Sequence, residues 1–123
     1  MRALVGMMKA LSDANRLRAI CALGERELCL CQIVELLGLA SSTVSRHMSL
    51  LQQARLVESR KEGRWTYFRL AADDAPAEAR EAIALVARAL QEDRAARDDL
   101  RRLQKILKLD REELCGRHGK CKP

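Results

Sequence analysis

The sequence predicts a mainly α-helical domain that carries one small β-hairpin, and three observations lead to this fold class. The chain has 123 residues, which is enough for one domain with a modest hydrophobic core. Its 2 prolines and 6 glycines leave long stretches without a helix breaker. Its only aromatic residues, Trp65, Tyr67 and Phe68, fall in one β-prone segment, so aliphatic side chains in helices must form the rest of the core.

Four helices are expected in the first half of the chain. Apolar residues at helical spacing predict one helix near residues 3–11 and a second within residues 12–24. A third helix is expected over residues 30–37 and ends at a glycine. A fourth begins at Ser41 or Ser42 after a short turn. A helix, a short turn and a second amphipathic helix form the helix-turn-helix pattern.

A basic β-hairpin follows, because two β-prone runs within residues 57–70 flank a glycine-containing turn. A basic hairpin after a helix-turn-helix is a wing, and a net charge of +6 with a pI near 9.4 favours double-stranded DNA as partner. Small hydroxyls on the fourth helix permit close approach to the major groove, and basic wing residues are expected to meet the DNA backbone or minor groove. The predicted DNA-binding residues are Ser42, Thr43, Ser45, Arg46 and Ser49 on the helix, and Arg60, Lys61 and Arg64 on the wing.

A single long helix is expected from Pro76 to about Leu107, because proline is favoured in the first turn and an apolar stripe continues to Leu107. This stripe is longer than its own subunit can cover, so the helix is expected to hold a homodimer with help from the first helix. We therefore divide the chain into a winged helix-turn-helix and dimerisation domain over residues 1–108, and a flexible, cysteine-containing tail over residues 109–123.

Five cysteines occur in a sequence that shows neither a secretory signal nor an apolar run long enough to cross a membrane. This usage is typical of reduced thiols in the cytoplasm, which is the expected location. Cys21 lies on an apolar helix face and is expected to pack in the core. Cys29 and Cys31, in contrast, form a soft-ligand pair directly before the helix-turn-helix.

Three segments carry a family resemblance: residues 27–31, with the pattern Glu-Leu-Cys-x-Cys, residues 39–48 and residues 56–65. Together they resemble the ArsR/SmtB metalloregulators, and in particular the arsenic-responsive repressors. The resemblance implies a winged-helix homodimer that binds its operator when empty and releases it when an ion binds. It departs from the arsenic-responsive pattern at Val34, where those repressors often carry a third cysteine. The ligands of the zinc-sensing branch look absent, because residues 76–108 contain no histidine.

Coordination chemistry then suggests a ligand set. As(III) and Sb(III) favour three thiolates in a trigonal pyramid, whereas zinc favours four ligands. Residues i and i+2 of a regular helix point about 200° apart, so Cys29 and Cys31 can hold one ion only where the helix start is frayed or unwinds. We expect a metal site formed by Cys29, Cys31, Cys115 and Cys121, in which a tail thiol supplies the third ligand, with As(III) or Sb(III) as inducer and no organic cofactor.

Two other functions remain open at this point. One is a repressor of the same fold that responds to thiol oxidation or to another soft metal such as cadmium, lead or zinc. The other is a small thiol enzyme or metal chaperone. A Cys-x-x-Cys on a βαβ unit and a phosphate-binding loop are both missing from the sequence, and a chaperone has no use for a wing, so an enzyme is not expected.

Overall fold

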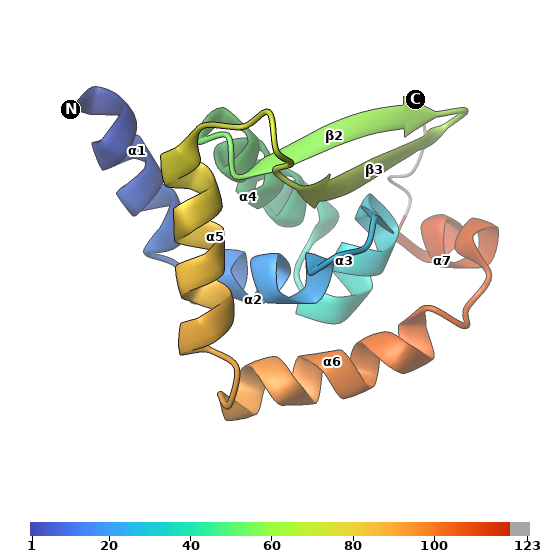
Figure 1. Ribbon diagram of the computed structural model, residues 1–123. Helices are drawn as coiled ribbons and strands as arrows, with labels where there is room; N and C mark the ends of the chain where they lie inside the picture. The colour runs from blue at the N-terminus through green and yellow to red at the C-terminus, as the bar shows by residue number, and fades with distance from the viewer. Residues whose placement is uncertain (119–123) are drawn as a thin grey trace.

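A computed structural model describes residues 1–118, and Figure 1 shows a body of helices with a small antiparallel sheet along one edge. No helix in this part of the chain combines the length and the apolar character needed to cross a membrane. The elements are α1 (Arg2–Leu11), α2 (Ala14–Leu23), β1 (Leu28–Cys29), α3 (Leu30–Leu37), α4 (Ser41–Gln53), β2 (Val57–Glu62), β3 (Trp65–Leu70), α5 (Ala77–Ala89), α6 (Arg94–Ile106) and α7 (Arg111–His118).

The helix-turn-helix is formed by α3 and α4, as the sequence predicts. Helix α3 ends at Gly38, which adopts a left-handed conformation with φ of 68° that only glycine adopts at little cost. The chain then turns into α4, whose inner side chains are fully buried against α2 and α3. The largest fully buried side chains of α2, α3 and α4 are Ile20, Leu23, Ile33, Val34, Leu36, Val44, Met48 and Leu51.

The wing is the predicted hairpin with one additional strand. Strands β2 and β3 pair antiparallel from Val57 opposite Leu70 to Glu62 opposite Trp65. The extra strand, β1, pairs with the other edge of β3 and places Cys29 opposite Tyr67, so the order is β1-β3-β2. A strand of two residues has no periodicity that a sequence pattern can reveal.

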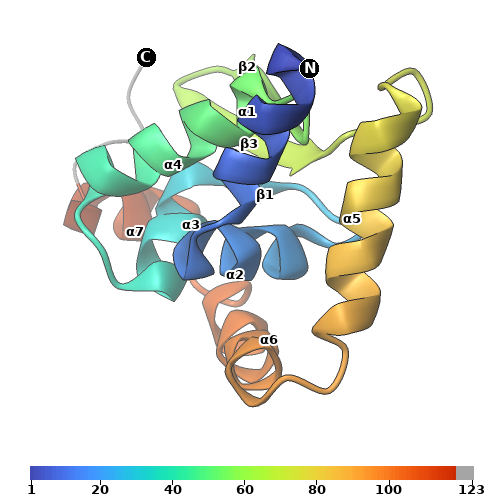
Figure 2. The ribbon, with the colours of Figure 1, turned by 90° about the vertical axis from the view of Figure 1, so that its left-hand side faces the viewer.

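The prediction of one helix from Pro76 to Leu107 is wrong. The chain breaks after Ala89, and α5 and α6 run in clearly different directions (Figures 1 and 2). The cause is local, because the Asp93 side chain accepts a hydrogen bond from the Ala96 backbone N–H at 3.0 Å and so caps a new helix. An aspartate in this position starts α6 where the apolar pattern alone suggests continuity.

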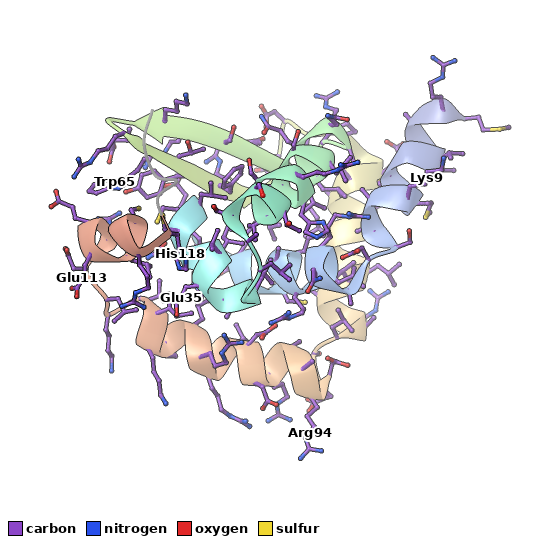
Figure 3. The ribbon with its side chains drawn as sticks, turned by 180° about the vertical axis from the view of Figure 1, so that it is seen from behind. Lys9, Glu35, Trp65, Arg94, Glu113 and His118 are labelled. Atoms are coloured by element: carbon purple, nitrogen blue, oxygen red, sulfur yellow. The ribbon has the colours of Figure 1, made fainter. Side chains whose placement is uncertain are left out.

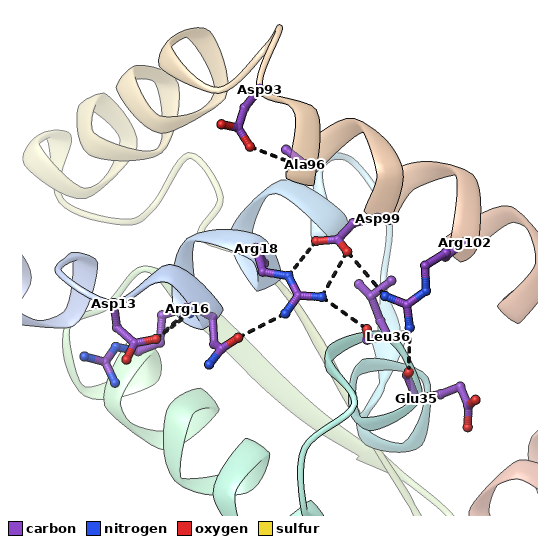
Figure 4. Close-up of polar contacts among 10 residues, drawn as sticks. Asp13, Arg16, Arg18, Glu35, Leu36, Asp93, Ala96, Asp99 and Arg102 are labelled. Atoms are coloured by element: carbon purple, nitrogen blue, oxygen red, sulfur yellow. Dashed lines mark hydrogen bonds and ion pairs between the residues drawn. The ribbon is translucent and has the colours of Figure 1, made fainter.

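Helix α6 packs on its own subunit, against α2 and α3. Asp99 is buried in this contact, where its carboxylate accepts hydrogen bonds from Arg18 of α2 at 2.8 and 3.0 Å (Figure 4). Leu103 and Ile106 of α6 are also buried. Within the second half of the apolar stripe, Leu103 is therefore covered by its own subunit, whereas Leu100 and Leu107 are 39% and 40% exposed.

Residues 111–118, expected to belong to a flexible tail, form helix α7 in this structure. The carboxylate of Asp110 accepts a hydrogen bond from the Glu113 N–H and caps the helix start. Leu114 and Cys115 are buried, and α7 packs against α3. Although distant in sequence, this helix thus lies beside the helix that carries Cys31.

The Arg18–Asp99 pair leads to a prediction about stability. Asp99→Ala is expected to lower the free energy of unfolding by about 3 kcal/mol, because it leaves a partly buried guanidinium without its carboxylate. Urea denaturation measures this change. Asp98→Ala is the matched control, since Asp98 pairs with Arg101 on the exposed face of the same helix and should contribute less than about 1 kcal/mol. Equal losses for the two variants would contradict this role of Asp99.

Candidate metal site and nucleic-acid interface

Cys29 and Cys31 lie at a strand-to-helix junction. Cys29 is the last residue of β1 and also the N-cap of α3, with an extended backbone at φ −79° and ψ 158°. Its N–H donates a hydrogen bond to the Oε1 atom of Gln32 at 2.9 Å. Cys31 lies in the first turn of α3, and both cysteine residues are 0% exposed.

Because Cys29 lies before the first residue of α3, the two cysteines are not two positions of one regular helix. Because Cys29 precedes the helix, the angle of about 200° between helical positions i and i+2 does not apply to the pair. The start of α3 therefore does not have to unwind merely to bring the two thiols to one side. Of the two expected cases, a frayed helix start or one that unwinds, the position of Cys29 outside the helix corresponds to the first, although burial of both residues still requires some opening before an ion can enter.

The structure brings Cys115 to the same region, because α7 packs against α3. Cys121 lies outside the described residues. Cys31 and Cys115 are in the disulfide-bonded state, whereas Cys21 and Cys29 are free thiols. Across residues 1–118, no three Cys, His, Asp or Glu side chains are gathered as ligands for one metal ion. A site with three ligands thus needs a rearrangement of this region or a contribution from Cys121.

Cys21 differs from the other cysteines in its surroundings. It is half-buried against the core and lines an apolar cavity of about 240 Å³ between α2, β3, α5 and α6. Burial, together with the nearby charges of Asp93 and Asp99, raises the pKa of the Cys21 thiol. A thiol that resists ionisation is a poor metal ligand, which agrees with the packing role expected for this residue.

The predicted DNA-binding residues of α4 all lie on its outer face. Val44, Met48 and Leu51 point into the core and His47 and Leu50 are half-buried, so the positions on the opposite side of the helix face solvent. This leaves a surface of short hydroxyl side chains with one arginine, next to the wing (Figure 1). The exposed residues are Ser42, Thr43, Ser45, Arg46 and Ser49.

On the wing, the three predicted residues differ in how they are held. Arg60 donates to both carboxylate oxygens of Glu27 at 2.7 and 2.8 Å, and its guanidinium lies over the Tyr67 ring. The hydrogen bonds to Glu27 and Glu62 raise the pKa of Arg60, and Arg60 in turn lowers the pKa of Glu27. Arg60 therefore ties the wing to the segment before β1, and it is less free to reach DNA than the exposed Lys61.

Arg64, the third wing residue, forms an ion pair with Glu112 of α7 at 3.2 Å. On the α3 side, Glu35 accepts from His118 at 2.9 Å and from Arg117 at 3.4 Å, and Figure 3 shows Glu35 beside His118. Sequence reasoning missed these contacts of α7. The signal that could have revealed the helix is Asp110 followed by two glutamates, a typical helix start.

Comparisons with known proteins agree with this architecture. Residues 13–59 match the family described as bacterial regulatory protein, arsR family. A homodimeric winged helix-turn-helix DNA-binding domain from Mycobacterium bovis, a possible ArsR-family regulator, has a similar structure with a TM-score of 0.63 and 27% identity. That likeness covers 76% of this chain and 82% of the other. The fold is thus a winged helix-turn-helix.

Sequence relatives identify the family. The chain is 36% identical over 67 residues to the arsenical resistance operon repressor of Escherichia coli (strain K12), covering 54% of this chain and 57% of that protein. It is 39% identical over 64 residues to the cadmium resistance regulatory protein CadC of Listeria innocua, covering 51% and 54%. It is also 34% identical to an uncharacterized HTH-type transcriptional regulator of Methanocaldococcus jannaschii, over 54% of this chain and 76% of that protein.

The chain belongs to the ArsR family. Its arsenic and cadmium relatives are named as regulators of resistance, and its structural neighbours include transcriptional regulators with the same winged helix-turn-helix fold. The chain spans little more than half the length of the arsenic and cadmium relatives, and they are named for different ions although the chain is similarly identical to both. Family membership alone thus leaves the inducing ion open between arsenic and other soft metals.

Proposed function

We propose that the protein is a DNA-binding repressor of an arsenic-resistance operon, and that it releases its operator when As(III) or Sb(III) binds to cysteine thiolates. The observation that carries this proposal is the position of Cys29 and Cys31. Cys29 pairs with Tyr67 in the wing sheet, and Cys31 lies in the helix that packs against α4. An ion bound between them acts on both DNA-contacting elements at once.

The binding step is a ligand exchange without change of oxidation state. Three thiols displace the three hydroxides of As(OH)₃, each thiol proton leaves with a hydroxide as water, and three As–S bonds form. Cys29 and Cys31 supply two of the sulfurs, and Cys115 on α7, or Cys121, supplies the third. In the cytoplasm, where thiols are kept reduced, these residues are available as ligands.

The operator contacts divide between the two exposed elements. The hydroxyl-rich face of α4, with Arg46, reads base edges in the major groove, and the wing contributes phosphate contacts. Among the wing residues, the exposed Lys61 is the main contributor, because Arg60 is held by Glu27. Arg64 contributes when it leaves its exposed pair with Glu112. Double-stranded operator DNA is thus the partner that this surface fits.

The second partner is another copy of the chain. Helix α1 exposes Leu4, Val5 and Met8, and α5 exposes Leu85, which are apolar residues that a soluble subunit rarely leaves uncovered together. A groove between α1, the end of α4 and the start of α5 adds to this surface. We propose that α1 and α5 form the homodimer, while α6 stays within its own subunit.

One observation favours a second candidate function. Cys31 and Cys115 are in the disulfide-bonded state, which is the chemistry of a thiol-redox repressor. In that case a peroxide oxidises two thiols to a disulfide, and the two protons and two electrons reduce the peroxide to two waters. A disulfide-bonded sulfur cannot bind arsenic, so arsenite and peroxide should act on different forms of the protein.

The DNA contacts can be tested by two substitutions. Arg46→Ala should cost about 1–3 kcal/mol of operator binding and relax sequence preference, because it removes a base-reading side chain. Lys61→Ala should weaken binding to all sequences and reduce the slope of log affinity against log salt by about 0.9. Fluorescence anisotropy on operator and scrambled DNA at several salt concentrations measures both. If Lys61→Ala loses the preference for operator over scrambled DNA and Arg46→Ala keeps it, then Lys61 reads the bases and Arg46 contacts phosphate, which is the reverse of this proposal.

The dimer can be tested by charging its proposed surface. The protein should sediment as a dimer at micromolar concentration, and Leu85→Glu should shift it to monomer, because a buried unpaired carboxylate opposes association. Leu109→Glu is the matched control, since Leu109 is similarly exposed but lies outside α1 and α5. A wild-type monomer, or equal dissociation of both variants, would count against this interface.

The inducer site can be tested with single cysteine variants kept reduced by a phosphine. Cys29→Ser and Cys31→Ser should bind operator DNA but no longer release it with arsenite, whereas Cys21→Ser should respond normally because its thiol packs in the core. Whichever of Cys115→Ser and Cys121→Ser weakens the response identifies the third ligand. Gel shifts with arsenite, antimonite, cadmium and zinc make the measurement, and peroxide is added only after the phosphine has been removed, because a phosphine consumes peroxide and reduces disulfides. Release by peroxide but not by arsenite would replace the proposal with the redox candidate.

A further inference from the structure

Helix α7 contacts the cysteine-bearing helix and the wing at the same time. Leu114 and Cys115 are buried on its inner side, and it packs against α3. Glu35 of α3 accepts hydrogen bonds from both Arg117 and His118 at the end of α7. These contacts fix the second half of α7 to the helix that carries Cys31.

The first half of α7 contacts the wing instead. Arg111 donates a hydrogen bond to the Tyr67 hydroxyl, and its guanidinium lies 5.3 Å from the Trp65 ring centroid and 5.6 Å from that of Tyr67. Glu112 pairs with Arg64 at 3.2 Å. In Figure 3 Trp65 lies directly above α7, and within residues 1–118 its indole Nε1 atom has no hydrogen-bond acceptor.

We propose that α7 is the element that transmits occupancy of the cysteine site to the wing. When Cys115 is joined to Cys31 through the bound ion, α7 is held in the docked position, where Glu112 takes Arg64 away from DNA and Arg111 fixes β3 through Tyr67. This inference rests on the proposed function, because it assigns the route by which the same site lowers DNA affinity.

The ion pair between Arg64 and Glu112 is weak enough to be made and broken as the cysteine site fills and empties. The Arg64–Glu112 pair is solvent-exposed, with side chains 53% and 64% exposed, so by itself it is weak and easily exchanged for a phosphate contact. A bond from Cys115 to α3 adds no new wing contact, but it raises the effective concentration of Glu112 beside Arg64. The ion therefore converts a weak pair into one that competes with DNA.

The sequence offers a matched pair of variants for the test. Glu112→Gln removes the wing contact, and Glu113→Gln removes the same charge one residue further along α7, where no wing contact is present in the described chain. Operator affinity is measured for the reduced full-length protein with and without arsenite. Binding of arsenite itself is followed through the absorbance of the As–S bonds.

In the arsenite-bound state, Glu112→Gln should bind operator about threefold more tightly than wild type, with a salt slope steeper by about 0.9, because one phosphate contact is regained. Glu113→Gln should behave as wild type in both respects. Trp65 is the only tryptophan in the chain, so arsenite should also change its emission in the wild type and much less in Arg111→Ala.

Three results overturn the inference. If arsenite binds and releases DNA in the wild type but both glutamine variants respond alike, α7 does not carry the signal and only this inference fails. If Trp65 emission is insensitive to arsenite while DNA is released, the wing contact of α7 does not change and the inference fails in the same way. If arsenite does not release wild-type DNA at all, the proposed function fails and this inference with it.

Discussion

Residues 28–31 are shared between two structures that would otherwise be independent. Leu28 and Cys29 form the edge strand of the wing sheet, and the same backbone continues into α3 with Cys29 as its N-cap. The Gln32 side chain fixes this change of direction by accepting the Cys29 N–H. Because α3 also packs against α4, the wing and the recognition helix are positioned by one short segment.

Helix α3, which continues from residues 28–31, is fixed in place by contacts with α2 and α6. Helix α6 lies against α2 and α3 through Leu103, Ile106 and the Arg18–Asp99 pair. Arg18 also donates to the Leu36 carbonyl at 3.4 Å, and Arg102 donates to the Glu35 carbonyl at 3.4 Å (Figure 4). These arginines satisfy carbonyls at the end of α3, which a helix terminus leaves without partners. The position of α3 is thus fixed at both ends.

Local and long-range determinants explain which elements the sequence could predict. The helices α1 to α4 and the hairpin were predictable because their apolar spacing is regular and their ends carry serine, aspartate or glycine. The break after Ala89 was missed because the stripe continues across it, although Asp93 is a typical N-cap. Strand β1 was missed because two residues have no pattern, and it is defined only by its distant partner β3.

The candidate site shows the same division between local and long-range information. Cys29 and Cys31 stand out in the sequence by their spacing, and the exposed face of α4 follows from its helical period. The pairing of Arg60 with Glu27 and of Arg64 with Glu112 cannot be read from the sequence, because the partners are far apart along the chain. The sequence therefore predicted the wing, but not that Arg60 and Arg64 are ion-paired to residues outside it.

Burial of the cysteine pair gives the proposed switch its physical basis. Since Cys29 and Cys31 are both 0% exposed, an ion cannot reach them unless the junction between β1 and α3 opens. The same junction positions both DNA-contacting elements, so the structure that accepts the ion cannot be the one that fits DNA best. By linkage, operator DNA must then weaken ion binding by the same factor by which the ion weakens DNA binding. A ligand pair on the surface, away from β1 and α3, would bind the ion with no such effect.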